Sequence, residues 1–427
     1  MLILLLGIEQ TSLVYPPFYH TMGINRGTLS YVKIITGKSI EIKDPDAIFG
    51  IKFDFLDDPK TSKDDDEPTI FLLSSEDAKI YFNKGFISFG YFDKRGAGED
   101  ELWFPTGISA LKNGSVFIVD MMNSMVKKFR FDGENLIYEK CIGRFGILPG
   151  YFNEPYDISI TERNEMYVSD KNNNRVQVLD TNGVFIREIK DLASPTAIFA
   201  RSNDDRYYRE KRNYVYVIDD DKKRINLFTD YGERITSINY IDIGLKDASF
   251  ERISLDSYGT VYVTDSKNHC VHIFTEKLKY LTSFGRKGKN EGEFIVPKGI
   301  TIVRRFNQIF IQDSWSIQYF WIGLDMWIKD IRPYIFKPGS GTTIYYFTTQ
   351  PAKVSINIYN EKDELVNKFY NSSWEEQGEH YIVWAGDYND GKLVPPGKYK
   401  IVITGKPLSY ARRFLEKKII AEVICTE

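Results

Sequence analysis

Histidine and cysteine are scarce in this sequence. The 427 residues include four histidines and three cysteines, so the side chains that most often ligate transition metals are few. Cys141, Cys270 and Cys425 are odd in number, which excludes a complete disulfide framework, and we expect them to be buried apolar side chains. From this supply of residues we predict no metal site, no catalytic residues and no bound cofactor.

A strong net charge is also missing. Lysine and arginine total 56 and aspartate and glutamate total 59, giving a formal charge of −3 and a pI near 6.0. Such a balance provides no general attraction to nucleic acid or to an anionic membrane, so we predict no nucleic-acid partner. No apolar run is long enough for a transmembrane helix.

The N-terminus carries a short apolar run at residues 2–8. This run has the length of the core of a secretion signal but lacks the basic residues expected before it. We interpret residues 1–28 as a leader or N-terminal extension and expect an extracytoplasmic protein, in the periplasm, at the cell surface or secreted. A cytoplasmic protein with an apolar start is the alternative.

Glycines and aromatic residues, in contrast, form a repeated pattern. The spacing G-x2-G-x3-G-x-F-x2-P occurs at residues 143–155 and again at residues 285–297, and three short apolar runs follow each copy. Aromatic residues make up 15% of the chain, which suits half-buried strands. Two copies of one spacing, each with the same runs behind it, indicate a repeat protein.

A run of the type x-V-x-V-x-D marks the individual copies. Its aspartates lie 46 to 50 residues apart, at Asp120, Asp170, Asp219, Asp265 and Asp313. A weaker copy with Ser74 at this position precedes them, which makes six copies over residues 45–331. Each copy holds four short alternating strands, a unit typical of a β-propeller blade. We expect the aspartate to fix the turn to the third strand through its carboxylate.

The glycine-rich linker, Phe-x-x-Pro, V-x-V-x-D and the following Asn174-Arg175-Val176 together resemble NHL repeats. The resemblance implies an all-β protein with a six-bladed propeller, which we place at residues 29–332. A hairpin at residues 31–42 is expected to pair the first and last copies, because closing the ring removes exposed edges. Two insertions, the acidic residues 57–68 and the basic residues 201–213, are expected on one face as solvated loops, with RNA binding by the basic one as the alternative.

A different strand pattern begins after residue 331. Alternating strands at residues 343–347 and 353–359 are followed by Trp384, Gly386 and the run 395–399, PPGKY. This order resembles the immunoglobulin-like module of flagellar hook-capping proteins, which recurs at the C-terminal ends of many secreted bacterial proteins; Ala385 departs from it, since that family usually has Asp there. The resemblance implies a β-sandwich at residues 333–427, and we expect residues 336–427 to fold alone.

The predicted propeller allows two alternative hypotheses about function. Propeller lyases and lactonases hold a metal in the central channel, but here the first strands offer Asp46, Asp157 and Asp256 without consistent partners. A channel-metal hydrolase or lyase is therefore the alternative hypothesis. The first hypothesis is a non-enzymatic binding or scaffold protein that recognises a protein, peptide or carbohydrate.

The connections between second and third strands carry the predicted ligand-binding residues. Arg175, Arg224, His269 and Trp315 come from different copies, and a propeller brings these connections together at one end of its channel. Trp315 would supply an apolar platform, and the arginines would pair with carboxylates or sugar hydroxyls. The competing interpretation is that the arginines only brace neighbouring blades.

Overall fold

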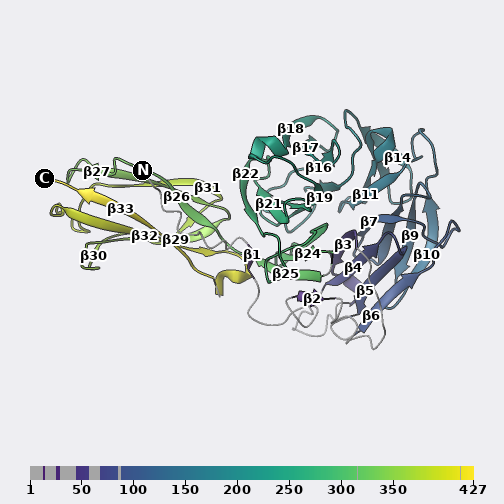
Figure 1. The fold of residues 1–427 in the computed structure, drawn as a ribbon, viewed down its shortest axis with the longest axis horizontal. Coiled ribbons are helices and arrows are strands. Elements are labelled where there is room, and N and C mark those ends of the chain that lie inside the picture. The colour runs from purple at the N-terminus through teal and green to yellow at the C-terminus, as the bar shows by residue number, and fades with distance from the viewer. Residues whose placement is uncertain are drawn as a thin grey trace. The chain divides into compact units, whose positions relative to one another are not determined.

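The computed structural model describes residues 13–14, 26–28, 45–56, 68–84, 88–314, 316–413 and 415–427. These residues are almost entirely β-strand (Figure 1), which confirms the all-β class. The helices that they contain are short 3-10 turns: η1 (Asp54–Leu56), η2 (Lys171–Asn173), η3 (Tyr240–Ile243) and η4 (Tyr410–Arg413). Within the described part of the chain no helix is long and apolar enough to cross a membrane. Two compact units divide the chain, Phe18–Phe320 and Trp321–Glu427, and strand β1 (Leu13–Val14) belongs to the second.

Antiparallel sheets of four consecutive strands succeed one another along the first unit. Each is a meander in which every strand pairs with its neighbours in sequence. The strands of these sheets are β3 (Ala47–Ile51), β4 (Thr69–Ser74), β5 (Lys79–Lys84), β6 (Ser88–Asp93); β7 (Pro105–Ala110), β8 (Ser115–Asp120), β9 (Met125–Phe131), β10 (Leu136–Ile142); β11 (Pro155–Ile160), β12 (Glu165–Asp170), β13 (Arg175–Asp180), β14 (Phe185–Ile189); β15 (Ile198–Arg201), β16 (Tyr214–Asp219), β17 (Arg224–Thr229), β18 (Arg234–Asn239); β19 (Phe250–Leu255), β20 (Val261–Asp265), β21 (Cys270–Phe274) and β22 (Tyr280–Phe284).

One further sheet combines the two ends of the repeat region. It contains β23 (Gly299–Val303), β24 (Gln308–Gln312) and β25 (Ser316–Ile322), and its outer strands come from the N-terminus. Strand β2 (Arg26–Thr28) pairs with Ser316–Gln318 of β25, and β1 pairs with Trp321 and Ile322. An N-terminal segment therefore covers the edge of the last sheet, as a closed ring requires.

The first strands of the sheets lie side by side around a common centre. Strand β3 contacts β7, β7 contacts β11, and the series continues through β15, β19 and β23, which contacts β3 again. Figure 1 shows β3, β7, β11 and β19 toward the centre of this unit, with the later strands of their sheets farther out. This is the arrangement of a propeller fold, with a channel between the first strands.

The cores of this unit lie between neighbouring sheets. In one of them, Phe117 and Val119 of β8 pack with Ile158 of β11 and with Met166 and Val168 of β12, all nearly inaccessible to solvent. A sheet with neighbours on both faces buries both sides of its middle strands. For that reason the V-x-V-x-D runs are apolar almost without interruption.

The repeated aspartates lie at the C-terminal ends of the second strands. Asp120, Asp170, Asp219, Asp265 and Asp313 are all fully buried. Each accepts a backbone hydrogen bond from the linker that precedes its sheet; Asp313, for example, accepts from the amides of Ile295 and Val296. The expected bond to the turn is present as well, since Asn173 Nδ2 donates to Asp170 at 2.9 Å. The aspartate thus holds both the turn and the linker.

The second unit consists of two sheets around one apolar core. One sheet contains β26 (Met326–Arg332), β28 (Thr342–Thr348) and β31 (Gly378–Trp384). The other contains β27 (Ile335–Phe336), β33 (Lys417–Cys425), β32 (Gly397–Pro407), β29 (Ala352–Tyr359) and β30 (Leu365–Glu375). The buried residues of the core between the two sheets include Leu324, Met326, Trp384 and Tyr399.

Strand β26 differs from the expected end of the repeat. We placed residues up to 331 in the last copy, whereas Met326–Arg332 pair with β28 of the second unit. The alternating pattern of this strand suits either sheet; in the structure it pairs with β28 along its length, and Met326 is fully buried in the second unit's core. The predicted domain limits of 29–332 and 333–427 stay a prediction, and the compact units meet upstream of them. The hairpin at residues 31–42 and nearly all of the acidic insertion lie outside the described residues.

Candidate functional site

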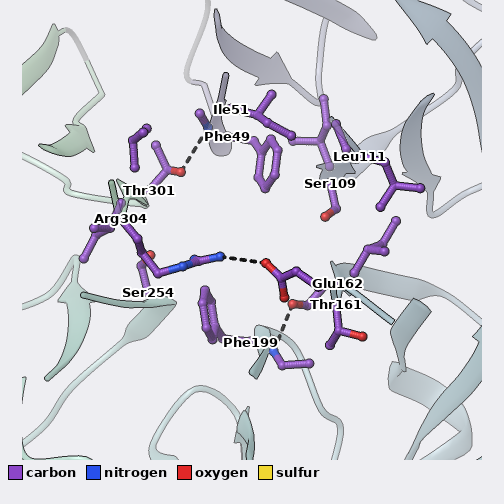
Figure 2. A pocket seen from close by; sticks show the side chains of 18 of the residues that line it. Phe49, Ile51, Ser109, Leu111, Thr161, Glu162, Phe199, Ser254, Thr301 and Arg304 are labelled. Atoms are coloured by element: carbon purple, nitrogen blue, oxygen red, sulfur yellow. Dashed lines mark hydrogen bonds and ion pairs between the residues drawn. The ribbon is translucent and has the colours of Figure 1, made fainter. Parts of the chain in front are cut away.

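A cavity of about 450 Å³ occupies the central channel of the first unit. All the first strands that line the channel contribute to it, together with five of the connections that lead from them to the second strands; the connection after β19 is the exception among the described residues. We call this end of the channel the channel mouth. In Figure 2 the rings of Phe49 and Phe199 flank the cavity, and Ser109, Thr161 and Ser254 surround it.

The walls of the cavity are mostly apolar, and its rim is mostly cationic. Isoleucines of β3, β7, β11, β15, β19 and β23 form much of the wall. The charged lining residues are Lys52, Lys112, Arg206, Arg252, Arg304 and Arg305 against Asp54, Asp157 and Glu162. Among the described residues, the cavity therefore combines apolar wall positions with more cations than carboxylates.

Arg304 is the central charged group of the channel mouth. It follows β23, and its Nε donates to Oδ2 of Asp205 at 2.6 Å, while its Nη2 lies 3.6 Å from Oε1 of Glu162, which follows β11 (Figure 2 shows the Glu162 contact). Burial raises the pKa of Glu162, although Arg304 acts against this. Burial also acts to raise the pKa of Asp205, but pairing with Arg304 holds it below its ordinary value. Arg304 is therefore well matched to Asp205 and only loosely paired with Glu162.

Residues 201–213, which we call the cap segment, extend across the channel mouth. The ring of Tyr208 is buried between two guanidinium groups, 4.1 Å from Arg201 and 5.0 Å from Arg304. The amide of Arg209 donates to the carbonyl of Ser257 in the next sheet. The expectation of a solvated loop is therefore wrong for Arg201 and Tyr208, because cation–π contacts and an ion pair between Arg201 and Glu276 bury them.

Two hydroxyl groups at the cavity are buried without a hydrogen-bond partner among the described residues. They belong to Thr161 and Tyr208, whose exposed fractions are 3% and 2%. A buried hydroxyl without a partner costs about 1–3 kcal/mol. Both residues belong to the lining of the cavity, and Figure 2 shows Thr161 at the wall, but the two hydroxyl oxygens themselves are covered by protein atoms.

The carboxylates considered for a channel metal lie in different surroundings. Asp157 is buried beside Arg252, with 3.8 Å between Oδ2 and Nε, and burial raises its pKa. Asp46 pairs with Lys298 at 2.9 Å, and Asp256 accepts the amides of Tyr258 and Thr260 in a turn. Within the ranges that the structure describes, no group of three His, Cys, Asp or Glu residues could hold a metal ion.

The predicted ligand-binding residues lie at the other end of the strands, and their side chains are engaged within the fold. Arg175 donates to Asp170, Glu188 and the carbonyls of Leu148 and Tyr151 at 2.9–3.2 Å. A ligand role for it stays a prediction to which these contacts add no support.

Two other predicted residues are held in a similar way. Arg224 makes two hydrogen bonds with Asp219, and His269 Nδ1 lies 2.6 Å from the carbonyl of Ile295. Their ligand role also stays a prediction. Trp315 lies outside the described residues.

The sequence also contained a repeated polar position that we did not use. Seven residues after the aspartate, on the third strand, stand Lys127, Gln177, Asn226 and His272. Each approaches the buried carboxylate of its own copy, at 3.3, 3.1, 2.7 and 3.0 Å respectively. The regular spacing was the available signal. Arg304, Glu162 and Tyr208 had no such signal, since they stand at different positions of their connections, which are residues 304–307, 161–164 and 202–213.

Comparison with known families agrees with the two parts of the chain. Residues 251–274, which cover most of β19 to β21, match the NHL repeat, and residues 331–407 match the FlgD Ig-like domain. The resemblance to NHL repeats and to the hook-capping module is thereby confirmed.

The similar curated proteins are much larger than this chain. "Protein brain tumor" of Drosophila melanogaster is 23% identical over 175 residues, which cover 39% of this chain and 16% of that protein. "Protein SUPPRESSOR OF QUENCHING 1, chloroplastic" of Arabidopsis thaliana is 27% identical over 126 residues, 27% of this chain and 12% of that protein. The match thus spans less than a fifth of either relative.

Among solved structures, a gluconolactonase from Xanthomonas campestris is similar with a TM-score of 0.45 and 12% identity, covering 65% of this chain and 87% of that one. Similarity at this level carries no information about the chemistry of this chain. Its two family matches, the NHL repeat and the FlgD Ig-like domain, agree with the division of the chain into a propeller and a second β unit.

Proposed function

We propose that this chain is a binding protein without catalytic activity of its own, which takes its ligand at the channel mouth of a six-bladed propeller. The ring of contacts from β3 through β23 and back to β3 supports six blades. Loops and strand ends on such a rigid scaffold are common positions for ligand recognition. The ligand classes predicted from the sequence are proteins, peptides and carbohydrates.

The observation that carries this proposal is the cavity itself. It is comparable in volume to ordinary small-ligand sites and is lined by every first strand. Phe49 and Phe199 present aromatic faces to it (Figure 2).

The second unit would be an immunoglobulin-like β-sandwich, and the protein would act outside the cytoplasm. The match of residues 331–407 to the FlgD Ig-like domain supports both statements. Cell fractionation of the native host tests the location; recovery of the protein with cytosolic markers would contradict it.

A ligand screen with one filled-channel variant tests the proposed function. The full chain is screened by thermal shift and by arrays of peptides, glycans and small organic molecules. Ser109 points into the cavity in Figure 2, so Ser109→Trp should remove binding by filling the space. Ser237→Trp, at an exposed position of the outer strand β18, is the matched control. Ligands that bind equally well to both variants would contradict a site at the channel mouth.

A further inference from the structure

Among the described residues that line the cavity, cations outnumber carboxylates. Six cationic residues stand against three carboxylates, and one pair of these, Asp157 with Arg252, lies deep in the channel. Positive charge in a cleft with low-dielectric walls attracts anions more strongly than the same charge on an open surface. The cations that outnumber the carboxylates therefore lie at the cavity, where they would attract an anionic ligand.

Arg304 has room for an anionic partner. Asp205 accepts from its Nε, but the contact of its Nη2 with Glu162 is 3.6 Å, longer than a hydrogen bond. The side chains of Arg304 and Glu162 are 23% and 32% exposed, so the pair can be reached from the mouth. A guanidinium prefers an anion with which it forms short, paired hydrogen bonds.

The rest of the cavity calls for an apolar body. Phe49, Phe199, Ile51 and Leu111 surround the space in Figure 2. The hydroxyl groups of a carbohydrate that lay against these apolar side chains would lose their hydration without a hydrogen bond in return. The wall chemistry thus favours a hydrocarbon or aromatic skeleton.

We propose that the ligand of the channel mouth is a small organic anion: an apolar body that enters between Phe49 and Phe199 and ends in a carboxylate or sulfonate-like group bound by Arg304. This inference rests on the proposed function, because it assumes that the channel mouth is the binding site. The anionic group replaces Glu162 as the partner of the Arg304 Nη2 atom.

Two fluorescent probes that differ in one group test the proposal on the full chain. The first is 8-anilinonaphthalene-1-sulfonate, and the second is N-phenyl-1-naphthylamine, which has the same aromatic body without the sulfonate. We expect the sulfonate to bind at least about tenfold more tightly, which corresponds to one strong charge-assisted contact. The difference should shrink as salt is added.

Variants of the charged residues at the rim distinguish this proposal from nonspecific binding of the probe to apolar surface. Glu162→Gln removes the carboxylate that competes for Arg304 and should tighten sulfonate binding about three- to tenfold. Lys112→Gln removes a rim cation and should weaken it by a similar factor. Neither change should alter the affinity of the neutral probe. Arg130→Gln, an exposed change on β9, is the control. Arg304 itself is avoided, since its loss leaves the buried Asp205 unpaired.

The outcomes distinguish the two proposals. Equal affinity for the two probes, with both lost in Ser109→Trp, would overturn the anion preference and leave the proposed site intact. Sulfonate binding that survives Ser109→Trp, or that weakens in Glu162→Gln, would overturn the anion site at Arg304. The absence of any binding by the sulfonate would overturn it as well, while the ligand screen would still decide the proposed function.

Discussion

Arg175 and Asp170 form a buried ion pair at the start of β13, with 2.9 Å between Nε and Oδ2. The arginine side chain is 11% exposed and the aspartate is fully buried. The same guanidinium also donates to the carbonyls of Leu148 and Tyr151 in the preceding linker. One side chain thereby joins the linker, the second strand and the third strand of its repeat.

Replacing Arg175 with Ala should therefore lower stability. Asp170 would keep its bonds from Asn173, Gln177 and the amide of Asn153 but would lose its cationic partner. We expect a loss of about 2–4 kcal/mol in the unfolding free energy, measured by chemical denaturation. Arg224→Ala is the comparison and should cost less, because that side chain is 27% exposed. An unchanged stability of Arg175→Ala, with lost ligand binding, would favour the ligand role instead.

Asp256 gives the stability a defined pH dependence. Burial raises the pKa of this carboxyl to about 6, against about 4 in an unfolded chain. The folded state therefore holds the proton more tightly, and this group's contribution to stability is full below pH 4 and is lost as the pH rises to about 6. Asp256→Asn should equal the wild type below pH 4 and exceed it by about 1–3 kcal/mol above pH 6.

Denaturation curves of the wild type and of Asp256→Asn between pH 4 and pH 8 check the predicted pH dependence of stability. Asparagine can still accept the amides of Tyr258 and Thr260, which both bond to Oδ1. A stability difference that is constant over this range would contradict the assigned cause.

Gly107 marks the closest approach of two first strands. A Cβ added there would lie 2.7 Å from the Cα of Asp157 and 3.1 Å from the amide nitrogen of Ile158. Gly107→Ala should push β7 and β11 apart and cost about 1–3 kcal/mol, seen as a lower melting temperature of the first unit. Gly397→Ala, whose added carbon would meet only side chains at 3.9–4.0 Å, should stay within about 0.5 kcal/mol. Equal effects would show that the strands can separate freely.

The limits of the second unit can be tested with fragments. Leu324 and Met326 are fully buried in its core, and β26 is hydrogen-bonded along β28. A fragment of residues 321–427 should unfold cooperatively, whereas residues 336–427, which we expected to suffice from the sequence, lack both side chains and that strand. Each missing side chain costs about 2–5 kcal/mol. Circular dichroism with thermal melting checks this, and equal stability of the two fragments would contradict the assignment of β26.

The repeat could be predicted from the sequence because the aspartate that marks each copy needs hydrogen-bond donors at fixed positions along the chain. A buried carboxylate such as Asp170 must find its donors at the same places in every copy, so the spacing recurs. The FlgD-type module was recognisable for a related reason, since Trp384 and Tyr399 pack against each other in its core. These requirements are local in each copy and are therefore visible in the chain.

The channel mouth was not predictable in this way. Arg304, Glu162 and Tyr208 come from three different connections, and their contacts depend on how the ring closes. The cap segment was noticed for its cations, but the cation–π packing of Tyr208 between Arg201 and Arg304 is set by tertiary structure alone. The pairing of β26 with β28 could not be predicted either, because an alternating pattern does not identify the partner of a strand.

Hydrogen–deuterium exchange of the full chain, with and without saturating 8-anilinonaphthalene-1-sulfonate, tests the central claim most directly. The two ends of the channel have separate connections: residues 161–164, 202–211 and 304–307 at the channel mouth, and residues 171–174, 220–223 and 266–269 at the opposite end. The account predicts slower exchange at the first set and no change at the second. Protection at the second set, with the channel mouth unchanged, would contradict it.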